Sequence, residues 1–142
     1  ENGSPLLVHS KKMVQKIKEF MPGNIEIELA MRYGNPNMEK ALLSLKNKNC
    51  QSLLVLPMFP QYSGTTTGSV FDEVSRILSK WRWVPAFNFI NSYHDNNNYI
   101  SALATSIQNH IKTKMPQKIV FTYHGMLAVQ ADLRLTDWWW QR

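Results

Sequence analysis

Apolar residues along the chain follow two alternating patterns. Four segments carry them at the three- and four-residue spacing of a helix with one buried face: Met13–Met21, Met38–Leu45, Val70–Trp81 and Ile100–Ile111. Between and after them come short runs of strand length, at 25–31, 52–59, 86–90 and 118–123. Strands that alternate with helices are typical of βαβ units. The pattern therefore predicts an α/β fold with a parallel four-stranded sheet flanked by helices.

Local signals refine this prediction. The first helix should stop at Pro22-Gly23, and Asn37 can cap the second, with Glu39 near its positive end. The run at 52–59 is continuously apolar, which favours a strand covered on both faces.

The two ends of the chain depart from the pattern. A doubly wound domain normally starts with a strand, so we expect one in front of Glu1. After Met126 the alternation is lost, and the chain finishes in Trp138-Trp139-Trp140-Gln141-Arg142. We interpret Leu127–Arg142 as a frameshifted or otherwise foreign tail, because three adjacent tryptophans fit neither helical nor strand periodicity.

Composition narrows the class of protein. A chain of 142 residues suffices for one domain with a core. Its apolar runs are too short to span a bilayer, and its start lacks the features of a signal peptide, so we expect a cytoplasmic location. The single cysteine, Cys50, excludes an internal disulfide framework and an iron–sulfur or zinc site built from several thiolates within the chain.

The net charge of +6 is compatible with nucleic acid, an anionic membrane surface or an anionic small molecule as partner. The lysines are scattered over the expected outer faces of several helices. This distribution favours a solvated surface over a dedicated polyanion-binding face.

Polar, turn-forming motifs follow each predicted strand. They occupy 32–36, 60–69, 91–95 and His124-Gly125. The carboxyl ends of parallel strands share one edge of the sheet, where α/β proteins bind ligands, so we expect the four motifs to form a site.

Each motif also has a structural interpretation. The hydroxyl-rich loop 60–69 could bind an anion at a helix start or merely cap that helix. Arg32 could grip a carboxylate or form a surface ion pair. His124 could be a base, a metal ligand or structural, and His94 is a weaker candidate. The sequence holds no HExxH pattern, which argues against a preassembled zinc site.

Taken in order, five groups of residues resemble the ferrochelatases over residues 3–126. They are Gly3-Ser4-Pro5-Leu6, Met31–Pro36, Leu56–Ser63 with Thr66–Ser69, Tyr93-His94 with Tyr99-Ile100, and Tyr123–Met126. The resemblance implies a chelatase-like fold of two Rossmann-like domains with a porphyrin between them. Residues 1–115 would be most of the first domain, 116–126 the start of the second, and 127–142 an unrelated tail.

The resemblance also implies roles for individual residues. His124 would be the catalytic residue, as acceptor of pyrrole protons or as ligand to the incoming iron. The substrate-binding residues would be Ser4, Arg32, Tyr33, Phe59, Ser63 and Thr65, with Arg32 and Ser4 holding propionates. Phe59 stands where some relatives have tyrosine, and Gly64 stands where cluster-bearing relatives have cysteine. No iron–sulfur cluster is therefore expected.

The implied partners are ferrous iron and a porphyrin, either protoporphyrin or coproporphyrin, with no cofactor and no nucleic acid. Peripheral contact with a membrane is left open. The family's second catalytic carboxylate and its Gly-Asp-Pro-Tyr segment have no counterpart here, so we expect this chain alone to be inactive. Two alternatives remain: a cobalt chelatase of sirohydrochlorin-type substrates, and a non-catalytic basic binding module.

Overall fold

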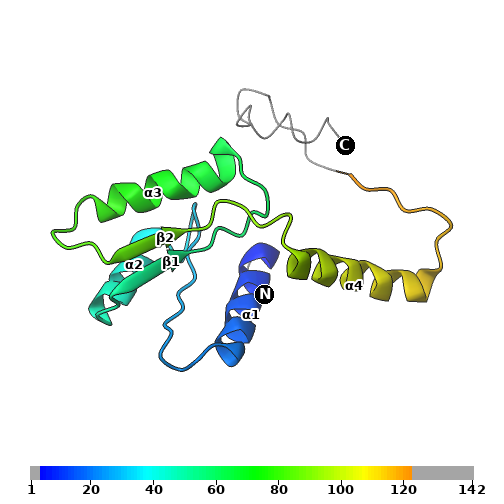
Figure 1. Cartoon of the computed structure of the whole chain (residues 1–142), viewed down its shortest axis with the longest axis horizontal. Coiled ribbons are helices and arrows are strands. Elements are labelled where there is room, and N and C mark those ends of the chain that lie inside the picture. Colours follow the sequence, from blue (N-terminus) through cyan, green and yellow to red (C-terminus); the bar gives the residue numbers. More distant parts are fainter. Residues whose placement is uncertain (1–3, 123–142) are drawn as a thin grey trace. The chain divides into compact units, whose positions relative to one another are not determined.

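The computed structural model describes residues 4–122. The elements in chain order are α1 (Pro5–Phe20), α2 (Met38–Asn47), β1 (Ser52–Val55), the π-helical turn η1 (Gly64–Gly68), α3 (Ser69–Leu78), β2 (Ala86–Phe89) and α4 (Asn97–Lys114) (Figure 1). Contacts divide these residues into two compact units. The first contains the described residues up to Leu54 together with Val70–Asn88, and the second contains Val55–Ser69 together with those from Phe89 onward.

The strands β1 and β2 form a parallel pair. The amide of Ala86 donates to the carbonyl of Gln51 at 3.0 Å, and the amide of Ile90 donates to that of Val55 at 3.0 Å. Both strands therefore advance in the same direction, as the βαβ pattern predicts. β1 ends four residues before the predicted end of its run, because Pro57 and Pro60 have no N–H to donate to a ladder.

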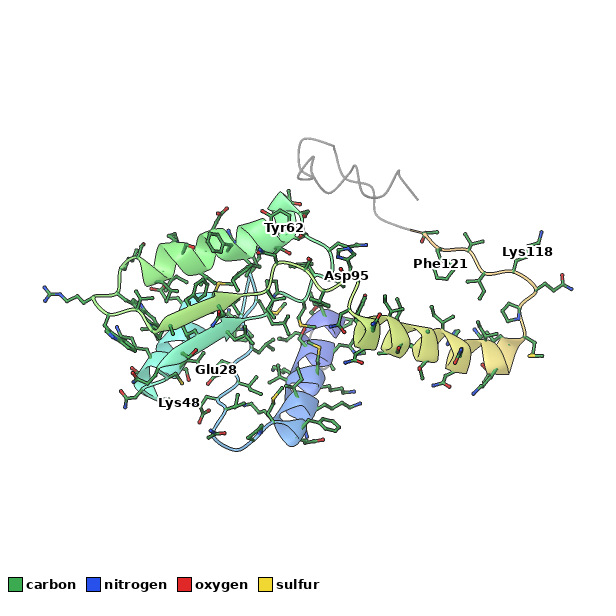
Figure 2. All side chains as sticks on the ribbon, viewed as in Figure 1. Glu28, Lys48, Tyr62, Asp95, Lys118 and Phe121 are labelled. Atoms are coloured by element: carbon green, nitrogen blue, oxygen red, sulfur yellow. The ribbon has the colours of Figure 1, made fainter. Side chains whose placement is uncertain are left out.

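The described residues form two strands where the sequence predicted four. The segment 25–31 contributes no strand but an isolated parallel bridge between Met31 and Asn37. Its side chains explain its path. The Lys48 ammonium, just beyond α2, lies 2.8 Å from a carboxylate oxygen of Glu26 and 3.1 Å from one of Glu28. Figure 2 labels Glu28 and Lys48. The extended backbone is thus held by ion pairs and not by a ladder.

The prediction of a strand at 118–123 is also wrong for residues 118–122, and Tyr123 lies outside the described part. Val120 in this run is 82% exposed. An apolar run becomes a strand when a neighbouring strand accepts its backbone hydrogen bonds, and no strand between residues 4 and 122 lies beside this one.

The core of the first unit comes from the predicted helix faces. Its buried side chains are Met38, Ala41 and Leu42 of α2, Leu53 of β1, and Val70, Val74, Ile77 and Leu78 of α3. Asn37 caps α2 as predicted, since its Oδ1 accepts from the amide of Lys40 at 2.9 Å. Side chains alternate across a strand, and Leu54 is exposed on the face opposite Leu53. The prediction that this strand is covered on both faces is therefore wrong.

The helices α1 and α4 contain no buried residue. α1 starts at Pro5, earlier than the apolar stripe suggested, because Ser4 is its N-cap and proline suits the first helical position. α4 begins after Asn96, whose side chain accepts from the amides of Asn98 and Tyr99. Among residues 4–122, no helix is long and apolar enough to cross a membrane.

Candidate functional site

The loop after β1 is organised by the hydroxyl of Ser63. Its Oγ accepts from the amide of Thr66 at 3.2 Å and lies 2.6 Å from the hydroxyl of Thr66 and 3.3 Å from that of Thr65. Ser63 is 4% exposed, so this hydroxyl is occupied inside the turn. The capping interpretation of the loop is therefore correct for Ser63.

The neighbouring threonines differ in exposure. Thr65 is exposed, whereas Thr67 is fully buried and its Oγ1 has no hydrogen-bond partner within the described chain. An unpaired buried hydroxyl costs free energy, so the turn gains its shape at some expense in stability. π-helical turns of this kind occur frequently at functional sites. Among the three threonines of η1, Thr65 is the exposed one.

Gly68 ends η1 where the neighbouring groups leave little room for a side chain. A Cβ built on Gly68 would lie 3.1 Å from the Tyr62 hydroxyl and 3.5 Å from the carbonyl oxygen of Ser63. Glycine here lets the Tyr62 ring lie against the backbone of the turn. The sequence motif contained both residues, but their contact was not predicted.

The loops that follow β1 and β2 meet in the second unit. The amide of Tyr93 donates to the carbonyl of Pro60 at 2.9 Å, which joins the two loops directly. The Tyr93 ring packs edge-on against Tyr99 at the start of α4, with 5.4 Å between centroids. Burial, and to a smaller extent Tyr99, raises the pKa of the Tyr93 phenol. The expectation that strand ends converge is confirmed for these two.

Arg32 and Tyr33 lie in the first unit, in the turn between the extended segment and α2. The turn closes through the amide of Met31, which donates to the carbonyl of Pro36 at 2.7 Å, and Gly34 takes a positive φ of 92° there. The Arg32 guanidinium lies 4.6 Å from the centroid of the Tyr33 ring, and Tyr33 is 74% exposed. The pair presents a cation beside an accessible aromatic face.

A second arginine, Arg76, pairs with the glutamate whose pKa Arg32 also affects. Arg76 of α3 holds Glu73 through two hydrogen bonds of 2.8 Å. This bidentate pair lowers the pKa of Glu73, and the Arg32 guanidinium contributes a smaller lowering.

The remaining predicted site residues are dispersed. Ser4 is exposed at the start of α1 in the first unit, and Phe59 is exposed in the second unit between β1 and η1. His94 is half-buried in the loop after β2. His124, the predicted catalytic residue, lies outside the described residues. The predicted set thus divides into Ser4, Arg32 and Tyr33 in one unit and Phe59, Ser63 and Thr65 in the other.

Within residues 4–122 no group of three or more histidine, cysteine, aspartate or glutamate side chains is arranged to hold a metal ion. Cys50 is a free thiol.

Comparison with known proteins addresses the same motifs. The profile of the ferrochelatase family matches residues 1–134. The match runs past Met126 into the segment that we interpreted as foreign. The start of that tail at Leu127 stays a prediction.

Curated relatives are similar over most of the chain. A ferrochelatase of Thioalkalivibrio sulfidiphilus is 42% identical over 131 residues, covering 89% of this chain and 36% of the relative. One of Hydrogenovibrio crunogenus is 44% identical over 130 residues, covering 88% of this chain and 34% of the relative. Ferrochelatase 2 of Shewanella oneidensis is 42% identical over 141 residues, covering 96% of this chain and 42% of the relative.

The chain therefore spans between a third and about two fifths of the length of these relatives. The family profile covers all of the described residues and every motif that carried the resemblance. On this match the chain belongs to the ferrochelatase family.

Proposed function

We propose that the chain supplies the porphyrin-holding part of a ferrochelatase, a lyase that inserts ferrous iron into a porphyrin to make haem. The observation that carries the proposal is the family match over residues 1–134. In the reaction Fe²⁺ enters the macrocycle and two pyrrole N–H protons leave, so a base must accept protons near the ring. We propose His124 for that role, or as the ligand that delivers the iron.

Arg32 and Tyr33 suit a flat macrocycle that carries carboxylates. The exposed ring of Tyr33 offers a face for a planar ligand, and a guanidinium can donate two parallel hydrogen bonds to a propionate.

The loop after β1 supports a second contact. We propose that Thr65 and Phe59 touch the porphyrin and that Ser63, whose hydroxyl is occupied, acts by holding Thr65 in place. Ser4 would add a hydroxyl for a propionate. A cytoplasmic location, the absence of an iron–sulfur cluster and a second domain of similar fold complete the proposal for the whole protein.

The test is a titration of the purified chain with mesoporphyrin, followed by the shift of its Soret absorbance. Arg32→Gln should weaken binding about tenfold, as expected for the loss of a charged hydrogen bond. Arg82→Gln, at an exposed arginine after α3, is the matched control. The dimethyl ester, which has no carboxylate, should bind wild type and Arg32→Gln alike. Equal affinity of both proteins for the free acid would remove Arg32 from the site.

The number of carboxylates separates the substrate classes. Coproporphyrin carries four carboxylates and protoporphyrin carries two. Comparing the affinity of the chain for each free acid with its affinity for the corresponding methyl esters would show how many carboxylates the chain contacts.

A further inference from the structure

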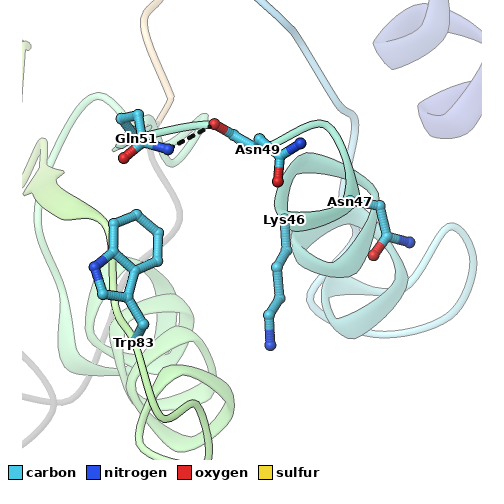
Figure 3. A pocket seen from close by; sticks show the side chains of 5 residues that line it. All are labelled: Lys46, Asn47, Asn49, Gln51 and Trp83. Atoms are coloured by element: carbon cyan, nitrogen blue, oxygen red, sulfur yellow. Dashed lines mark hydrogen bonds between the residues drawn. The ribbon is translucent and has the colours of Figure 1, made fainter.

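The first unit has a hollow at the amino-terminal end of its two strands. It lies between Gln51, the residue before β1, and Trp83, three residues before β2 (Figure 3). The predicted porphyrin-site loops follow the opposite, carboxyl ends of these strands. The hollow measures about 500 Å³ and is lined by Lys46, Asn47, Asn49, Gln51 and Trp83. A volume of this order lies within the usual range for small-molecule sites.

One wall of the hollow is aromatic and the other cationic. Figure 3 shows the Trp83 indole facing the hollow across from the Lys46 side chain. Trp83 is 54% exposed, so much of its surface is available for stacking. The Lys46 ammonium is held 4.6 Å from the centroid of the Trp81 ring, which restricts an otherwise flexible side chain.

The remaining lining groups are carboxamides. Gln51 donates from Nε2 to the carbonyl of Asn49 at 3.0 Å, which fixes the orientation of its amide. Asn49 itself adopts a left-handed backbone conformation with φ of 58°, one that asparagine tolerates better than most residues. Carboxamides donate and accept hydrogen bonds in one plane, as the edge of a nucleobase requires.

These groups select a ligand by chemistry. Lys46 disfavours cations, and the lining has no carboxylate for a divalent metal. A purely apolar ligand would use neither the ammonium nor the amides for binding. The combination that satisfies all of them is a planar ring with a hydrogen-bonding edge, joined to an anionic group.

We propose that this hollow is a nucleotide-binding site, in which a base stacks on Trp83, its edge meets the carboxamides and a phosphate pairs with Lys46. Base and phosphate can come from a free nucleotide or from a nucleic-acid strand, and the shared chemistry is the same. The site is independent of the proposed porphyrin chemistry.

The test is isothermal titration calorimetry of the 142-residue chain with AMP. Adenosine and ribose 5-phosphate are the part-ligands, and an eight-residue oligodeoxyadenylate represents a strand. We expect saturable binding of AMP, weaker binding of both part-ligands, and a 1:1 ratio. Binding of the oligonucleotide in preference to AMP would identify a strand as the source, and the reverse would identify a free nucleotide.

Two variants assign the binding to the hollow. Trp83→Leu should weaken AMP about tenfold, the range for one stacked base. Lys46→Gln should weaken AMP about threefold and leave adenosine unchanged, because adenosine has no phosphate. Lys112→Gln on α4 is the control of equal charge change, and circular dichroism checks folding of all three. Absence of AMP and oligonucleotide binding at millimolar concentrations would overturn the proposal. AMP binding by folded Trp83→Leu and Lys46→Gln that is as strong as binding by wild type would also overturn it.

Discussion

At the scale of single residues, the hydroxyl of Ser63 is the group on which the candidate loop depends most. It caps the turn and lies next to the hydroxyls of Thr65 and Thr66. Ser63→Ala leaves the amide of Thr66 without this acceptor, and we expect the free energy of unfolding to fall by about 1 kcal/mol. Urea unfolding would measure the change. Ser92→Ala, at an exposed serine, should change it by less than about 0.5 kcal/mol. Equal effects of the two substitutions would contradict the capping role.

Glu28 gives the extended segment a dependence on pH. A hydrogen bond from the Ser44 hydroxyl at 2.7 Å lowers the pKa of Glu28, and the Lys48 ammonium adds to the lowering against the opposing effect of burial. A lowered carboxyl pKa means that the folded state favours the carboxylate. Its contribution is therefore present above the ordinary glutamate pKa of about 4.3 and is lost as the pH falls below it.

Glu28→Gln should accordingly lower stability at pH 7 by about 0.5 kcal/mol, a small value because the pair is partly solvated. Near pH 3 the variant and wild type should unfold at the same urea concentration. Glu19→Gln on α1 is the control for removal of an exposed glutamate. A gap between Glu28→Gln and wild type that persisted or widened at pH 3 would show that the carboxylate is not its cause.

At the scale of elements, α3 and α4 carry similar apolar stripes with different consequences. Ile77 of α3 is 3% exposed and Ile100 of α4 is 48% exposed. Truncating a buried isoleucine to alanine removes contacts and leaves a cavity, whereas an exposed one loses little. We expect Ile77→Ala to cost about 3 kcal/mol and Ile100→Ala less than about 1 kcal/mol. Chemical denaturation of both variants tests this, and equal losses would mean that α4 packs as tightly as α3.

The helices were more predictable from the sequence than the strands. Periodicity and caps such as Asn37 and Asn96 are local, so the positions of α2, α3 and α4 followed from nearby residues. A strand depends on a partner remote in sequence. The runs 25–31 and 118–122 both have strand composition. In the structure the first run forms an ion pair with Lys48 and the second is exposed to solvent, and composition reveals neither.

At the scale of the whole molecule, sequence motifs identified the family but not the geometry of the site. The motifs correctly placed the loops after β1 and β2 beside one another. They did not indicate that the Ser63 hydroxyl is consumed by its own turn or that Gly68 accommodates Tyr62, because both depend on side-chain packing. The role of His124 stays a prediction.

The 142 residues by themselves should insert no iron above the spontaneous rate. They cover between a third and about two fifths of the relatives, and part of a cleft holds a macrocycle poorly and admits water. Exposed apolar residues such as Val120 also favour aggregation. Anaerobic mixing with porphyrin and ferrous iron, followed by haem absorbance, is the assay. Turnover that disappeared in His124→Ala would show that the chain is catalytic alone.

Iron insertion by a complete enzyme that contains this segment tests the proposed function most directly. Residues 4–122 would replace the aligned part of the Thioalkalivibrio sulfidiphilus ferrochelatase, and anaerobic iron insertion would be measured for the chimera and its Arg32→Gln variant. We expect insertion well above the spontaneous rate, with a higher KM for the porphyrin in the variant. A chimera that folds and binds no porphyrin, or that binds porphyrin and inserts no iron, would contradict the proposed function.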